Sequence, residues 1–194
     1  LVLFKKITEH KKFIFILLAV ALLLPAPSLN SGFQGDDWIH RFLLLKRSPI
    51  SQTNDISLYG LFSFTNGNIS RNHAAMDKGL MPWWALEKLK VSFWRPLSEL
   101  THGFDYKLWP NNAVMMHIHN VLLFVLVILL LFTLYRKLQI PPWVAGLAAL
   151  LYVIDDARAI PVSWLANRNA ILAVFFGIAT IIFHHRWRSE NDRI

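Results

Sequence analysis

The chain has 194 residues, of which 55% are hydrophobic and only 16% are charged, and its net charge is +8. This composition is too apolar for an ordinary soluble domain and predicts an integral membrane protein in contact with the lipid bilayer. The basic residues stand in short clusters beside apolar runs, a pattern that orients membrane spans, so we expect no nucleic-acid partner. The absence of cysteine excludes a disulfide framework, a thiolate nucleophile and a cysteine-ligated metal.

The first apolar run follows four lysines and is closed by Pro25 and Pro27. A cleaved signal peptide has the same outline, with a basic start, an apolar core and small residues after it. When the run is extended to residues 13–29, however, it reaches the minimum length of a membrane-spanning helix. Because further spans follow, we expect a retained first span.

Residues 30–112 are a long region of mixed polar and aromatic character, in which tryptophan is frequent. Tryptophans beside membrane spans are typical of anchors at the level of the lipid headgroups. Short amphipathic helices are expected at 38–46 and 83–93, with Gly and Asn turns around 65–68 between them.

Two adjacent carboxylates, Asp36 and Asp37, stand near the start of this region between Gly35 and Trp38. Paired acids beside an aromatic residue suit the deprotonation of an acceptor hydroxyl, or the holding of a cation near a phosphate leaving group. The other interpretation is an aspartate N-cap ahead of a helix, where negative charge is favourable.

Residues 113–135 form the clearest span, which ends at the basic residue Arg136. His117, His119 and Asn120 lie in its first turns, where polar groups facing lipid are costly, so we expect them to face protein, water or a ligand. His117 and Asn120 are three residues apart and share a helix face, whereas His119 points elsewhere.

A third apolar segment, 140–154, is short for a full crossing and ends at Asp155 and Asp156. The expected fourth span, 164–183, begins with a polar stretch that contains Arg168. With four spans the basic flanks all fall on one side, which the positive-inside rule makes cytoplasmic.

The predicted fold is therefore an all-α integral membrane domain of about four spans, with both termini in the cytoplasm and a long external loop, 30–112, between the first two spans. Both acidic pairs then meet at the non-cytoplasmic face. The cationic and imidazole side chains expected to join them there are Arg95, His117 and Arg168. This convergence predicts a functional site.

Several stretches resemble motifs of one group of membrane glycosyltransferases. Residues 93–97 (FWRPL), 104–106 (FDY), Asn111, His117 and 120–123 (NVLL) resemble the "RPL…DY…NP…H..NVLLH" pattern of membrane O-mannosyltransferases carrying tetratricopeptide repeats and of their bacterial relatives. Residues 162–165 (VSWL) with Arg168 and Leu172 are similar to the "VAWI.GR..LL" of that family. Residues 35–38 resemble the acidic motif in the first external loop of GT-C glycosyltransferases in general.

The resemblance runs from Asp36 to about Leu172 and implies a partial GT-C-like bundle. Asp155 and Asp156 stand where the mannosyltransferases commonly have His-Pro, and Phe124 stands where a His is frequent, which favours the broader superfamily over that branch. GT-C enzymes have about twice as many spans, so the resemblance implies that residues 1–194 are the N-terminal part of a larger module.

The activity that the resemblance implies is transfer of a sugar from a polyprenyl-phosphate donor to a hydroxyl of a protein or glycan acceptor, at the external face of a bacterial inner membrane. The roles it implies are a base for Asp36 or Asp37, donor phosphate binding for Arg95, His117 and Arg168, acceptor binding for Asp155 and Asp156, and ordering of the site for Asn120, His119 and Trp164.

A divalent metal is compatible with these residues, since carboxylates beside His117 or His119 offer suitable ligands. No spacing in the chain resembles a dedicated metal motif, and we assign no metal ligand. The alternative function is a non-enzymatic membrane subunit or transporter component, in which the polar residues line a path or a partner interface.

Overall fold

The computed structural model describes residues 2–45, 60–138 and 140–191, which fall into two compact units. The bundle unit comprises Leu1–Gly32 and Ala113–Ile194, and the central unit comprises Phe33–Asn112.

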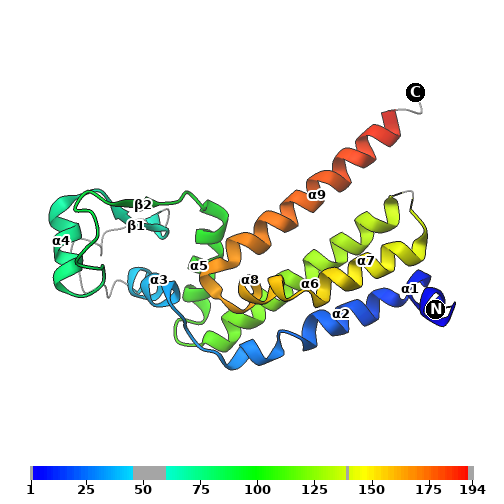
Figure 1. The fold of residues 1–194 in the computed structure, drawn as a ribbon, viewed down its shortest axis with the longest axis horizontal. Helices are drawn as coiled ribbons and strands as arrows, with labels where there is room; N and C mark the ends of the chain where they lie inside the picture. The colour runs from blue at the N-terminus through cyan, green and yellow to red at the C-terminus, as the bar shows by residue number, and fades with distance from the viewer. Residues whose placement is uncertain (1, 46–59, 139, 192–194) are drawn as a thin grey trace. The chain divides into compact units, whose positions relative to one another are not determined.

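The bundle unit is helical. Its elements are α1 (Val2–Glu9), α2 (Phe13–Leu23), η1 (Ala26–Asn30), α6 (Ala113–Lys137), α7 (Pro142–Ile154), η4 (Asp156–Arg158), α8 (Ala159–Ser163), η5 (Leu165–Asn167) and α9 (Arg168–Asn191). The long helix α6 packs against α2, α7 and α9, and Figure 1 shows α9 diverging from the other helices towards its C-terminal end. Leu17 of α2, Ile128 of α6 and Ala149 of α7 are fully buried in the core that these helices share.

Three helical segments are long and apolar enough to cross a membrane: Phe13–Asn30, Ala113–Lys137 and Leu165–Ser189. At 1.5 Å per residue, α6 is about 38 Å long, which exceeds the hydrocarbon core of about 30 Å. The expected third span corresponds to α7, which has 13 residues and is therefore only about 20 Å long. Three of the four expected spans are thus found as full-length helices, and the four-span topology and its sidedness stay predictions.

Helix α1, which the sequence did not predict, lies against α7. Gly146 of α7 is the point of contact, because a Cβ atom built there would lie 2.1 Å from the carbonyl oxygen of Thr8. Thr8 is fully buried. A residue without a side chain is therefore required at position 146 for the two backbones to approach this closely.

The central unit contains a helix, a two-stranded sheet and two further helices. Its elements are α3 (Asp36–Leu44), β1 (Ser63–Asn66), α4 (Ile69–Asp77), β2 (Lys90–Ser92) and α5 (Pro96–Leu108). The strands are antiparallel, with Thr65 opposite Val91, so the protein is mostly helical rather than all-α. The backbone N–H of Val91 donates to the Thr65 hydroxyl at 2.9 Å.

The expected short helices of this region are partly found. Helix α3 confirms the one expected at 38–46 as far as Leu44, and the last predicted residue lies outside the described part of the chain. The helix expected at 83–93 is wrong: this stretch holds turns and β2, because its residues pair with β1. Helices α4 and α5 begin at residues that favour a helix start. Asn68 is the N-cap of α4, and its side chain accepts from the Arg71 backbone N–H at 3.0 Å. Pro96 stands in the first turn of α5.

Candidate functional site

The acidic pair begins helix α3, and its two carboxylates have different surroundings. The N-cap is Gly35, at φ 48°, a conformation that residues with a Cβ rarely adopt, so the N-cap interpretation of the aspartates is wrong in detail. Asp37 is only 2% exposed and its Oδ2 accepts from the backbone N–H of Gln34 at 3.0 Å. The Gln34 carbonyl accepts from the Asp37 N–H in return, so Asp37 closes the first turn of the helix.

Asp36 is half-buried and is the better candidate for proton transfer. Burial raises the pKa of its carboxyl group, and the charge of Arg95 lowers it by a smaller amount. A carboxylate whose pKa is raised is a stronger base than an ordinary one. Asp36 thus combines partial access with the electrostatics of a general base.

Arg95 lies just before α5 and is held between two aromatic rings. Its guanidinium carbon is 4.8 Å from the ring centre of Phe62 and 4.7 Å from that of Phe93. Cation–π contacts of this kind restrict a long side chain and orient its guanidinium group.

Four titratable side chains form a buried polar cluster that the sequence analysis missed. They lie on α3 and α5, are each at most 2% exposed, and are His40, Glu99, His102 and Asp105. The ring centres of His40 and His102 are 5.3 Å apart, and that of Phe62 is 4.6 Å from His40. The sequence did contain a sign of this cluster, because its three residues on α5 recur at every third position and so share one helix face.

Burial governs the charges in this cluster. Burial, with a smaller contribution from the charge of Arg95, lowers the pKa of His40 to about 3, so its imidazole is neutral at pH 7. Burial also raises the pKa of Glu99, while the backbone of Phe62 and Leu61 lowers it by less. Neither ring nitrogen of His40 has a hydrogen-bond partner among the described residues. Unsatisfied buried polar groups are costly, which marks His40 as a position to test for function.

Within residues 2–45, 60–138 and 140–191, no group of three or more His, Cys, Asp or Glu side chains is arranged to hold a metal ion.

The bundle unit contains the polar start of α6. His117 and Asn120 are fully buried, whereas His119 is partly exposed, which confirms that the first two share an inward face. His117 Nε2 lies 2.8 Å from the Gly32 carbonyl oxygen and 3.3 Å from the Ser31 hydroxyl. His117 thus ties the segment after η1 to α6.

Arg168, the first residue of α9, is fully buried beside Asn120. Its Nε donates to Asn120 Oδ1 at 2.5 Å and its Nη2 donates to the Met116 carbonyl at 3.4 Å. The Asn120 amide nitrogen donates in turn to the Val162 carbonyl at 3.3 Å. These contacts join α6 to α8 and α9, and any phosphate would have to reach a guanidinium that is buried among helices.

Asp155 and Asp156 are exposed at the end of α7. Asp155 Oδ1 accepts from the Ala157 N–H at 3.0 Å and so caps the short helix η4, while Arg158 lies 3.8 Å from its other oxygen. Asp155 thus stands at the end of α7 and at the start of η4. Trp164 is partly buried between α8 and η5.

The predicted site residues thus belong to two units. Asp36, Asp37 and Arg95 lie in the central unit. The remaining ones lie in the bundle unit and are His117, His119, Asn120, Asp155, Asp156, Trp164 and Arg168. The structure brings together Asn120 with Arg168. Asp36 and Arg95 share the central unit, where the charge of Arg95 lowers the pKa of Asp36. The meeting of the two acidic pairs at one surface stays a prediction.

No protein-family model, no curated protein and no solved structure matches this chain. The likeness to GT-C enzymes therefore depends on the sequence motifs alone. Function has to be argued from the side chains and their surroundings.

Proposed function

We propose that the protein is a membrane glycosyltransferase component that transfers a sugar from a polyprenyl-phosphate donor to an acceptor hydroxyl on the non-cytoplasmic face. The observation that carries the proposal is the half-buried carboxyl group of Asp36, whose pKa is raised by burial and lowered by a smaller amount by the charge of Arg95. Arg95 lies in the same unit and contacts two aromatic rings.

Asp36 is the base of the proposed reaction. Its carboxylate takes the proton of the acceptor hydroxyl as the hydroxyl oxygen attacks the anomeric carbon of the sugar. The bond from that carbon to the phosphate oxygen breaks, and the lipid phosphate leaves with the electron pair. Because attack comes from the face opposite the leaving group, the anomeric configuration is inverted.

Arg95 is the phosphate-binding residue of the proposed reaction. The phosphate gains negative charge as the glycosidic bond breaks, and a guanidinium that is already oriented stabilises that charge without reorganisation. Asp37, by contrast, is assigned to the fold of the first turn of α3, because its carboxylate accepts from the Gln34 backbone.

The test measures transfer of radiolabelled mannose or glucose from the corresponding polyprenyl phosphates in membrane vesicles that contain the full chain. Asp36→Asn should lower kcat by roughly a hundredfold or more, because loss of a general base has this magnitude. Arg95→Lys should raise KM for the donor. Asp77→Asn, an exposed acid at the end of α4, is the matched control and should leave the rate unchanged.

An unchanged transfer rate for Asp36→Asn, at an expression level confirmed by immunoblot, contradicts the proposal. It would leave the carboxylate without a chemical role.

The non-enzymatic subunit remains the second candidate, and the contacts of Arg168 favour it. A buried arginine that donates to Asn120 and Met116 holds α6 and α9 together without needing a substrate. In a subunit of this kind, Arg168→Gln should weaken assembly of the bundle, whereas Asp36→Asn should have no effect.

A further inference from the structure

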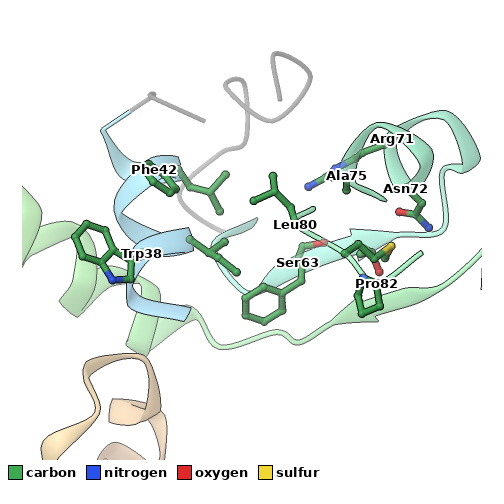
Figure 2. A pocket seen from close by; sticks show the side chains of 13 residues that line it. Trp38, Phe42, Ser63, Arg71, Asn72, Ala75, Leu80 and Pro82 are labelled. Carbon is green, nitrogen blue, oxygen red and sulfur yellow. The ribbon is translucent and has the colours of Figure 1, made fainter. Parts of the chain in front are cut away.

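A cavity of about 280 Å³ lies in the central unit between α3, β1, α4 and the segment that follows α4. Most of its wall is apolar and comes from Ile39, Leu43, Phe64, Leu80, Met81 and Pro82. Figure 2 shows these elements around the cavity, with Leu80 between α3 and α4. A concave, mostly apolar surface with a few polar groups is the usual form of a small-molecule site.

Arg71 of α4 supplies the positive charge of the cavity. Its guanidinium has no hydrogen bond or ion pair with the described residues, and Figure 2 shows its nitrogen atoms directed towards Leu80. Burial lowers the pKa of Arg71, as expected for a cation that lies partly out of water. A partly buried guanidinium group is stabilised by a bound carboxylate, which matches its geometry.

Asn72, the next residue, supplies an acceptor. Its side chain is only 1% exposed, and its amide nitrogen donates to the carbonyl oxygens of Glu87 at 2.8 Å and Leu89 at 3.1 Å. These two bonds set the orientation of the amide. The amide oxygen has no partner in the described part of the chain and lies on the cavity side in Figure 2. A buried acceptor of this kind is stabilised by a hydrogen bond from an O–H or N–H donor.

We propose that this cavity binds a single-chain amphiphilic acid that has a hydrogen-bond donor next to its carboxylate, as in an N-acyl amino acid. The carboxylate pairs with Arg71, the amide N–H donates to Asn72 Oδ1, and the acyl chain lies against the apolar wall. The central unit follows one candidate span and precedes another directly in the chain, so a bilayer crossed by these spans would be a source of ligands with an acyl chain. The site is independent of the proposed sugar transfer.

The test is equilibrium dialysis of radiolabelled N-octanoylglycine against the full chain in nanodiscs, with empty nanodiscs subtracted. We expect saturable binding that is about tenfold to a hundredfold weaker for Arg71→Gln, since a charged hydrogen bond has this effect. The methyl ester, which lacks the charge, should bind the unaltered protein more weakly by a similar factor. Octanoate, which lacks the N–H, should also bind more weakly.

Lys88→Gln is the matched control, because Lys88 is an exposed cation of the same unit that does not line the cavity. It should bind N-octanoylglycine as the unaltered chain does. The proposal is overturned by an absence of saturable binding, by equal binding of acid and ester, or by equal losses in the Arg71 and Lys88 variants. Octanoate that binds as well as N-octanoylglycine would overturn the role of Asn72. The ester comparison uses the unaltered protein, so it decides the matter even if Arg71→Gln does not fold.

Discussion

Replacing His40 with phenylalanine should change how the stability of the central unit depends on pH. His40 is 1% exposed, and its ring packs 4.6 Å from that of Phe62 and 6.1 Å from that of Phe64. A phenylalanine ring has a similar shape and removes two nitrogen atoms that have no hydrogen-bond partner in the described chain. The substitution should therefore cost little stability at pH 7.5.

The sign of the pH effect follows from the pKa of His40, which is lowered from 6.5 to about 3 in the folded protein. Between these values the unfolded chain binds a proton at this position and the folded chain does not, so acid favours unfolding. The stability that the neutral imidazole retains above pH 6.5 is lost progressively as the pH falls towards 3. Between pH 7.5 and 5.0 the loss is about 2 kcal/mol, at about 1.4 kcal/mol per pH unit below 6.5.

Thermal unfolding followed by tryptophan fluorescence in detergent at pH 7.5 and 5.0 measures this loss. Lowering the pH should reduce the Tm of the unaltered chain, relative to that of His40→Phe, by about 4–8 °C, because 1 kcal/mol corresponds to about 2–4 °C at this size. The difference between the two proteins isolates His40. Glu99, whose pKa is raised, acts in the opposite sense and is present in both.

His73→Phe is the matched control, because His73 lies in the same unit but its side chain is 49% exposed beside Glu87. It should retain the pH response of the unaltered chain. A Tm difference between His40→Phe and the unaltered chain that is the same at both pH values would refute the argument, since His40 would then titrate as an exposed histidine does.

Two further predictions concern the bundle unit and the topology. Gly146→Ala should displace α1 from α7, because the new Cβ would meet the Thr8 carbonyl oxygen. Limited proteolysis should then cut the N-terminal segment faster. A proteolysis rate equal to that of the unaltered chain would mean that the helices do not meet there. The chain has no cysteine of its own, so single cysteines can report the topology. A cysteine at Asn66 should react with an impermeant maleimide added from outside, whereas a cysteine at Lys137 should react only after permeabilisation. The reverse pattern would contradict cytoplasmic termini.

The sequence alone determined the features that depend on local composition. Apolar runs of sufficient length identified the helices at residues 13–29, 113–135 and 164–183, because an α-helix is the structure that satisfies its own backbone in lipid. The inward face shared by His117 and Asn120 followed from their spacing, since residues three apart lie on one side of a helix. The short helix expected at 38–46 was also found from local pattern, as α3.

Tertiary structure alone decided which polar groups meet. The fate of residues 83–93 as turns and a strand depended on pairing with β1, more than twenty residues away, which local pattern does not encode. The different surroundings of Asp36 and Asp37 depended on the positions of Arg95 and of the Gln34 backbone. The buried polar cluster arose because α3 and α5 pack together, and the low pKa of His40 follows from that burial, since desolvation is a property of the whole environment and not of the residue.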